Sequence, residues 1–138
     1  MTELETLKKE FASGKYRVIE KDLETFLVKN AESIKKFKEQ VSSKLGRECS
    51  TEMAIKWYIL QIRSINPTDE IKSELDEIEK EIWYRAEQEG GRIDRSKVAE
   101  EWCMRHAPGW RDHRVLSIIF VFDQNKERYT SVLDKLWK

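Results

Sequence analysis

The sequence predicts an all-α fold, a compact bundle of about six helices in a single domain of residues 1–138. Three observations predict it. Apolar residues recur at steps of three, four or seven along most of the chain, capping residues precede these stretches, and glycine or proline separates them. A chain of 138 residues is long enough to bury one core without disulfides.

The first two elements follow from local signals. Thr2 and Glu5 have the spacing of a capping box and predict a short helix to about residue 12. Gly14 is expected to stop it in a left-handed conformation. The apolar positions over 16–45 then predict one long amphipathic helix, kinked near Asn30 and ended by Gly46.

The next helix is expected to begin after a capping residue at Ser50 or Thr51 and to be closed by Asn66-Pro67. Thr68 is then the expected cap of an acidic helix over 69–89. Its apolar stripe consists of Ile71, Leu75, Ile78, Ile82 and Ala86, and Trp83 and Tyr84 lie near its end. Gly90-Gly91 is the most flexible point of the chain, and we interpret it as a turn within one domain.

The last third of the chain contains one ambiguous segment. Asp94 is expected to cap a helix, and Pro108-Gly109 predicts a tight helical corner after it. The apolar run 115–122 has the composition of a buried strand, but the apolar steps continue to Leu136 and favour a helix of about 25 residues. Because this helix is apolar on several faces, we expect it to be central in the domain or partly covered by a second subunit.

The net charge excludes a general attraction to nucleic acid, since 26 basic residues balance 26 acidic residues. The acidic residues are concentrated, because residues 69–91 hold nine acids and three bases. We interpret this segment as a solvated helix face lying near the lysine-rich stretch 29–47, and a basic partner is the alternative.

The cysteines and the N-terminus indicate a cytoplasmic protein. Cys49 and Cys103 lie far apart without a partner motif, so neither a disulfide framework nor a paired-cysteine metal site is expected. The N-terminus is charged from its third residue, and no apolar run has the length of a membrane span. We therefore expect no export signal and no membrane partner.

The stretch 102–114 is the strongest candidate for a binding site, because it concentrates tryptophan, histidine and arginine around Pro108-Gly109. Tryptophan and arginine are the residues that most often anchor protein partners. The candidate partner-binding residues are Trp102, Arg105, His106, Trp110, Arg111, His113 and Arg114. In the alternative, the two tryptophans close a small core under the turn and the arginines pair with Glu100, Glu101 or Asp112.

Signals for catalysis or metal binding are weak. The residues preceding Ser13-Gly14-Lys15 lack the first glycine of a phosphate-binding loop, and no strand precedes them. Glu100, Cys103 and His106 lie at intervals of three, but they spread over about a third of the helix circumference. We therefore expect no cofactor, no metal site and no catalytic residue.

The function predicted is that of a non-catalytic, helical protein-interaction module with an unknown protein partner. Self-association as a homodimer through the helix over 115–136 is a further expectation. The alternative is a DNA-binding regulator, because the helices on either side of Pro108-Gly109 resemble a helix-turn-helix in outline. A small enzyme or metal-binding protein comes third.

Overall fold

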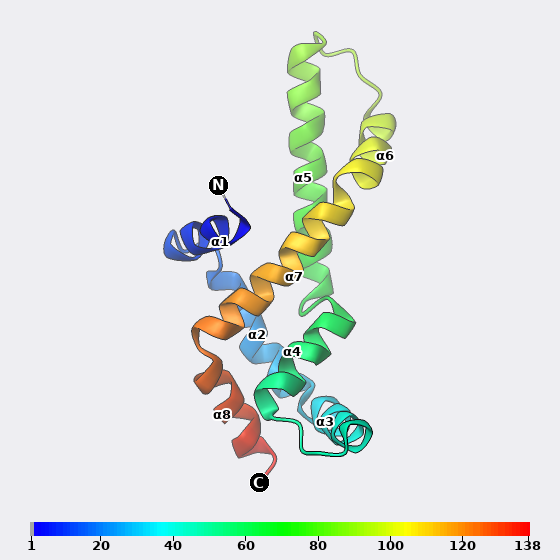
Figure 1. The fold of residues 1–138 in the computed structure, drawn as a ribbon. Helices are drawn as coiled ribbons and strands as arrows, with labels where there is room; N and C mark the ends of the chain where they lie inside the picture. The colour runs from blue at the N-terminus through cyan, green and yellow to red at the C-terminus, as the bar shows by residue number, and fades with distance from the viewer. Residues whose placement is uncertain (1) are drawn as a thin grey trace. The chain divides into compact units, whose positions relative to one another are not determined.

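The computed structural model describes residues 2–138, and within them the chain is all-α, with eight helices and no strand. The helices are α1 (Glu3–Ala12), α2 (Arg17–Lys29), α3 (Ala31–Leu45), α4 (Thr51–Ile62), α5 (Pro67–Gln88), α6 (Arg95–Arg105), α7 (Ala107–Gln124) and α8 (Lys126–Leu136) (Figure 1). The predicted fold class is therefore confirmed, with two helices more than expected. Among these helices, none is long and apolar enough to cross a membrane.

The residues group into two compact units. Unit 1 consists of the residues up to 65 together with 115–138, and unit 2 consists of residues 66–114. The chain leaves unit 1 after α4 and returns to it along α7. Gly90 and Gly91 lie inside unit 2, where both have positive φ and connect α5 to α6.

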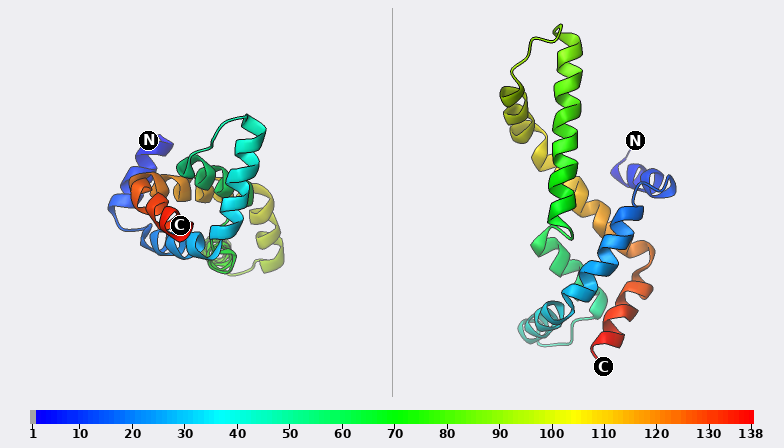
Figure 2. Two further views of the ribbon diagram at one scale, coloured as in Figure 1. Left: turned by 90° about the horizontal axis from the view of Figure 1, so that it is seen from below. Right: turned by 180° about the vertical axis from the view of Figure 1, so that it is seen from behind.

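Unit 1 contains a large apolar core. In it α8 packs against α2 and α4, and α3 packs against α4 (Figures 1 and 2). Its fully buried side chains include Leu23, Leu27, Ile34, Ile55, Ile59, Ile118, Val121, Phe122, Tyr129 and Leu133. The apolar run 115–122 is thus helical, and its own chain buries Val115, Ile118, Val121 and Phe122 but leaves Leu116 exposed.

Asparagine interrupts both of the long helices that the periodicity predicted, at the expected kink near Asn30 and, without having been expected, at Asn125. The predicted helix over 16–45 is two helices separated at Asn30, and the predicted helix over 115–136 is interrupted at Asn125. Both asparagines leave helical geometry, with ψ values of 13° and 38°. The Asn30 side-chain amide donates to the carbonyl of Phe26 at 2.9 Å, which is the competition with backbone hydrogen bonding that disfavours asparagine inside helices.

Most of the predicted caps are present. Thr2 and Glu5 form the capping box, Ser50 accepts a hydrogen bond from the Met53 amide, and Asp94 accepts one from the Lys97 amide. Gly46 ends α3 with a φ of 69°, as predicted. These caps were predictable because each depends on residues at most a few positions apart.

Both prolines begin a helix, contrary to their predicted places. Pro67 is in the first turn of α5, where Asn66 and not Thr68 is the cap and accepts from the Asp69 amide at 3.2 Å. Pro108 lies in the first turn of α7, so the corner after α6 is at His106 and not at Pro108-Gly109. A first-turn proline loses no helical hydrogen bond, and its fixed φ already suits the helix.

Polar contacts join the helices of unit 1 around the core. Buried Ser117 donates to the hydroxyl of Tyr16 at 3.2 Å, and that hydroxyl donates in turn to Glu10. Lys56 and Asp123 form an ion pair at 2.6 Å, and the hydrogen bond to Asp123 raises the pKa of Lys56. These contacts connect segments distant in sequence, so the C-terminal helices are held by polar as well as apolar interactions.

Two alanine substitutions in α7 test the core. Ile118 is 0% exposed and Leu116 is 40% exposed, so only the first leaves a cavity when truncated. We expect Ile118→Ala to lower the free energy of unfolding by about 2–5 kcal/mol. The matched control Leu116→Ala is expected to lower it by under about 1 kcal/mol. Urea denaturation followed by circular dichroism measures both, and equal losses would contradict the burial of this helix.

Candidate functional site

The seven predicted site residues differ in how much of each residue is exposed to solvent. Trp102, on α6, is only 6% exposed. Arg105, His106 and Arg111 are exposed, whereas Trp110, His113 and Arg114 are partly buried. The rings of Trp102 and His106 lie near each other, with centroids 6.5 Å apart. The predicted corner thus presents Arg105 and His106 to solvent, but it does not present the indole of Trp102.

The two arginines of α7 are paired with acids of α5. Arg111 forms an ion pair with Glu74 at 2.9 Å, and Arg114 forms ion pairs with Asp69 at 3.2 Å and Glu70 at 3.9 Å. Sequence reasoning considered nearer acids as partners and missed these pairs, because 37 residues separate Arg111 from Glu74. The acidic face of α5 is therefore neutralised in part by arginines of its own unit.

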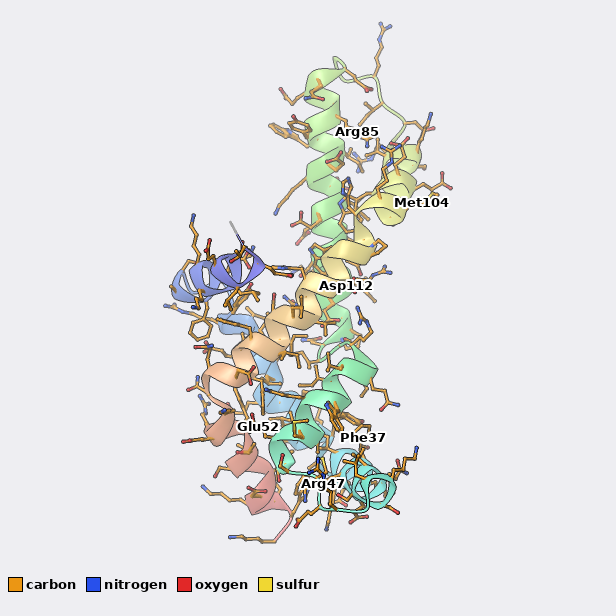
Figure 3. The ribbon with its side chains drawn as sticks, in the orientation of Figure 1. Phe37, Arg47, Glu52, Arg85, Met104 and Asp112 are labelled. Carbon is orange, nitrogen blue, oxygen red and sulfur yellow. The ribbon has the colours of Figure 1, made fainter. Side chains whose placement is uncertain are left out.

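Three further ion pairs hold α5 and connect it to α6. Arg85 contacts Glu81 at 3.1 Å and reaches Glu101 of α6 at 2.5 Å, and Arg95 contacts Glu79 at 2.7 Å. Figure 3 labels Arg85 on the side of α5 that faces α6. The hydrogen bond with Arg85 lowers the pKa of Glu101, and the same contact raises the pKa of Arg85.

An open groove of about 430 Å³ lies between these two helices. We call it the aromatic groove; it is lined by Glu77, Lys80, Glu81, Trp83 and Tyr84 of α5 and by Trp102 of α6. Trp83 and Tyr84 are 65% and 54% exposed, respectively. Trp102, being buried, forms a fixed wall, whereas the other two rings lie at the solvent-accessible edge.

The residues of the aromatic groove were only partly visible in the sequence. Trp83 and Tyr84 are next to the apolar stripe of the acidic helix without belonging to it, and that position was the available signal for exposure. Lys80, Glu77 and Glu81 carried no distinguishing signal, because charged residues are frequent throughout this helix.

Other sites of the described chain offer less chemistry. Within residues 2–138, no three histidine, cysteine or acidic side chains are grouped closely enough to hold a metal ion. Cys49 is buried and Cys103 is exposed, and both are free thiols. A second hollow, of about 330 Å³ in unit 1, is lined by Thr51, Glu52, Lys126, Glu127, Thr130 and Asp134. Lys126 and Glu52 pair across it at 3.6 Å, so its charges are partly satisfied internally.

No protein-family model, curated protein sequence or solved structure matches this chain.

The ion pair of Arg85 and Glu101 predicts a pH-dependent stability. Because the pKa of Glu101 is lower in the folded chain than its ordinary value of 4.5, the ion pair stabilises above that value. This contribution disappears as the pH falls through the lowered pKa. We expect Glu101→Gln to reduce the thermal midpoint at neutral pH, and the difference from wild type to shrink in acid.

Thermal melts followed by circular dichroism across this pH range provide the measurement. Glu100→Gln is the matched control, since Glu100 is an exposed neighbour without a recorded ion pair. An equal loss in both variants, or a loss in Glu101→Gln that persists unchanged at low pH, would show that the ion pair does not hold α6.

Proposed function

We propose that this chain is a non-catalytic module that binds another protein through the aromatic groove. The observation that carries the proposal is the exposure of Trp83 and Tyr84 beside a wall formed by Trp102. Large aromatic side chains lose favourable free energy when they stay in water, and they recover it when a partner covers them. Tryptophan and tyrosine are also the residues that dominate binding energy at protein interfaces.

The surroundings of the aromatic groove favour a preformed binding surface. Trp102 is held by burial, and Arg85 joins the two helices by contacting Glu81 and Glu101. A partner therefore meets a wall whose position is already fixed, which lowers the entropy lost on binding. Trp102 also belongs to the predicted corner, so exposed Arg105 and His106 remain candidates for contacts beside the groove.

The structure offers the DNA-binding alternative no specific support. Arg111 and Arg114 lie on the second helix of the helix-turn-helix outline, and both form ion pairs with carboxylates of α5. Residues 69–91, which include most of α5, are also rich in acids, which phosphates repel. We therefore prefer a protein partner in the cytoplasm, a compartment consistent with the two free thiols.

Paired substitutions on α5 test this function. We expect Trp83→Ala with Tyr84→Ala to reduce recovery of the native partner by at least about tenfold, because two central aromatic contacts are lost. The control is Ile71→Ala with Leu75→Ala, two exposed apolar residues of the same helix outside the groove. Affinity capture from native extract with quantitative mass spectrometry measures recovery for wild type and each variant.

The outcomes discriminate between surfaces. Unchanged recovery of the partner with the Trp83→Ala, Tyr84→Ala variant would reject the proposal. A loss of recovery only with the control variant would show that the partner binds around Ile71 and Leu75 and not at the groove. A third variant, Arg105→Ala with His106→Ala, reports on the predicted corner. Retention on duplex DNA that weakens steeply with salt, and is lost in Arg105→Glu, would favour the DNA-binding regulator instead.

Self-association is a second property that we propose for the chain. The helices over 115–136 bury most of their apolar side chains inside unit 1, and Leu116 and Leu136 stay exposed on them. We expect Leu116→Glu with Leu136→Glu to weaken a dimer formed through these helices, because dimerisation would then remove two carboxylates from water and bury them at an apolar contact. Size-exclusion chromatography with light scattering gives the mass, and a wild-type monomer at high concentration would contradict the expectation.

A further inference from the structure

The aromatic groove combines ring faces with carboxylates. Trp83, Tyr84 and Trp102 supply the rings, and Glu77 and Glu81 supply the acids. We infer that an arginine side chain of the partner, presented by a flexible segment, occupies this groove; the inference rests on the proposed function. A guanidinium is the group that fits both features, because it stacks on aromatic faces and donates to carboxylates in a planar, two-pronged geometry.

The charge of the groove complements a cation. Residues 69–91 hold nine acids and three bases, and two of the acids line the groove. One carboxylate oxygen of Glu77 accepts from Lys80, and one oxygen of Glu81 accepts from Arg85. Both of these hydrogen bonds go to Oε1, and within residues 2–138 no side chain donates to Oε2 of Glu77 or Glu81, so Oε2 can accept from a ligand.

Lys80 does not block the groove. Its side chain is 73% exposed and its contact with Glu77 is 3.3 Å long, three residues apart on the same helix. Exposed pairs of this kind contribute about 0–1 kcal/mol at most. An incoming guanidinium can therefore replace the ammonium group at little cost, while Lys80 turns into solvent.

The same helix already shows a preference for arginine over lysine. Arg85, Arg95, Arg111 and Arg114 all pair with acids of α5, whereas the lysine pair seen on this helix among residues 2–138 is the exposed contact of Lys80 with Glu77. Arginine is less strongly hydrated than lysine and is preorganised for two parallel hydrogen bonds. The arginine–carboxylate pairs within unit 2 are thus the same kind of contact that we infer between the groove and the arginine of a partner.

Titration of synthetic peptides into the full chain tests the inference. The probes are four fluorescein-labelled Gly-Ser peptides of equal length, which carry two arginines, two lysines, two citrullines or two glutamates. We expect the arginine peptide to bind several-fold more tightly than the lysine peptide, and the other two not to bind. Fluorescence anisotropy at low salt measures the dissociation constants.

Charge-matched variants locate the site. Glu77→Gln with Glu81→Gln is expected to weaken the arginine peptide by about tenfold, because two charge-assisted contacts are lost. Asp76→Asn with Glu87→Gln removes the same charge from exposed acids of α5 outside the groove and should change the affinity by under about twofold. Glu77→Gln alone leaves the Arg85 contacts intact, and circular dichroism verifies the fold of each variant.

The results separate this inference from the proposed function. Equal affinities for the arginine and lysine peptides, equal effects of the two double variants, or no peptide binding at all would each overturn the inference. If the arginine inference is overturned but recovery of the native partner still falls in the Trp83→Ala, Tyr84→Ala variant, the proposed function stands without the arginine inference. If partner recovery is also unchanged, the proposed function fails as well.

Discussion

Unit 2 depends on the pairing of arginine guanidinium groups with the carboxylates of α5. Its buried side chains are few, namely Ile82, Val98, Trp102 and Ala107, so apolar burial alone supplies little to hold α6 and the start of α7. The less exposed ion pairs add to this burial, because Arg85 connects α5 to α6 through Glu101 and Arg114 connects the start of α7 to α5 through Asp69. Because α6 carries Trp102, the position of the groove wall follows from electrostatic contacts as much as from packing.

Unit 1, in contrast, is held mainly by apolar burial and less by ion pairs. Its core joins side chains from both ends of the chain, and the residues that follow unit 2 supply a large part of it, among them Ile118, Phe122 and Tyr129. A buried hydrogen bond between Tyr16 and Ser117 also joins the part of unit 1 that precedes unit 2 to the part that follows it. Apolar burial of this extent is largely insensitive to salt, whereas the exposed ion pairs of unit 2 are screened by it. The two units therefore respond to different solution conditions.

The fold class and the caps were predictable because they depend on nearby residues, as at Thr2, Ser50 and Asp94. The break at Asn30 was expected as a kink, whereas the break at Asn125 was not, since the apolar steps continue in phase across it. The site was predicted only in part. Trp102 was identified, but sequence could not distinguish its burial from the exposure of Trp83, because exposure depends on how α5 and α6 pair.

The order of the segments has a consequence for biosynthesis. Unit 1 is discontinuous in sequence, since residues 66–114 separate its two parts. During translation, all of unit 2 is synthesised before α8, so the side chains of α2 and α4 that pack against α8 stay uncovered there until α8 has been made. The nascent chain therefore exposes part of its apolar core until α7 and α8 have been made, and packing of these two helices removes a surface through which chains could aggregate.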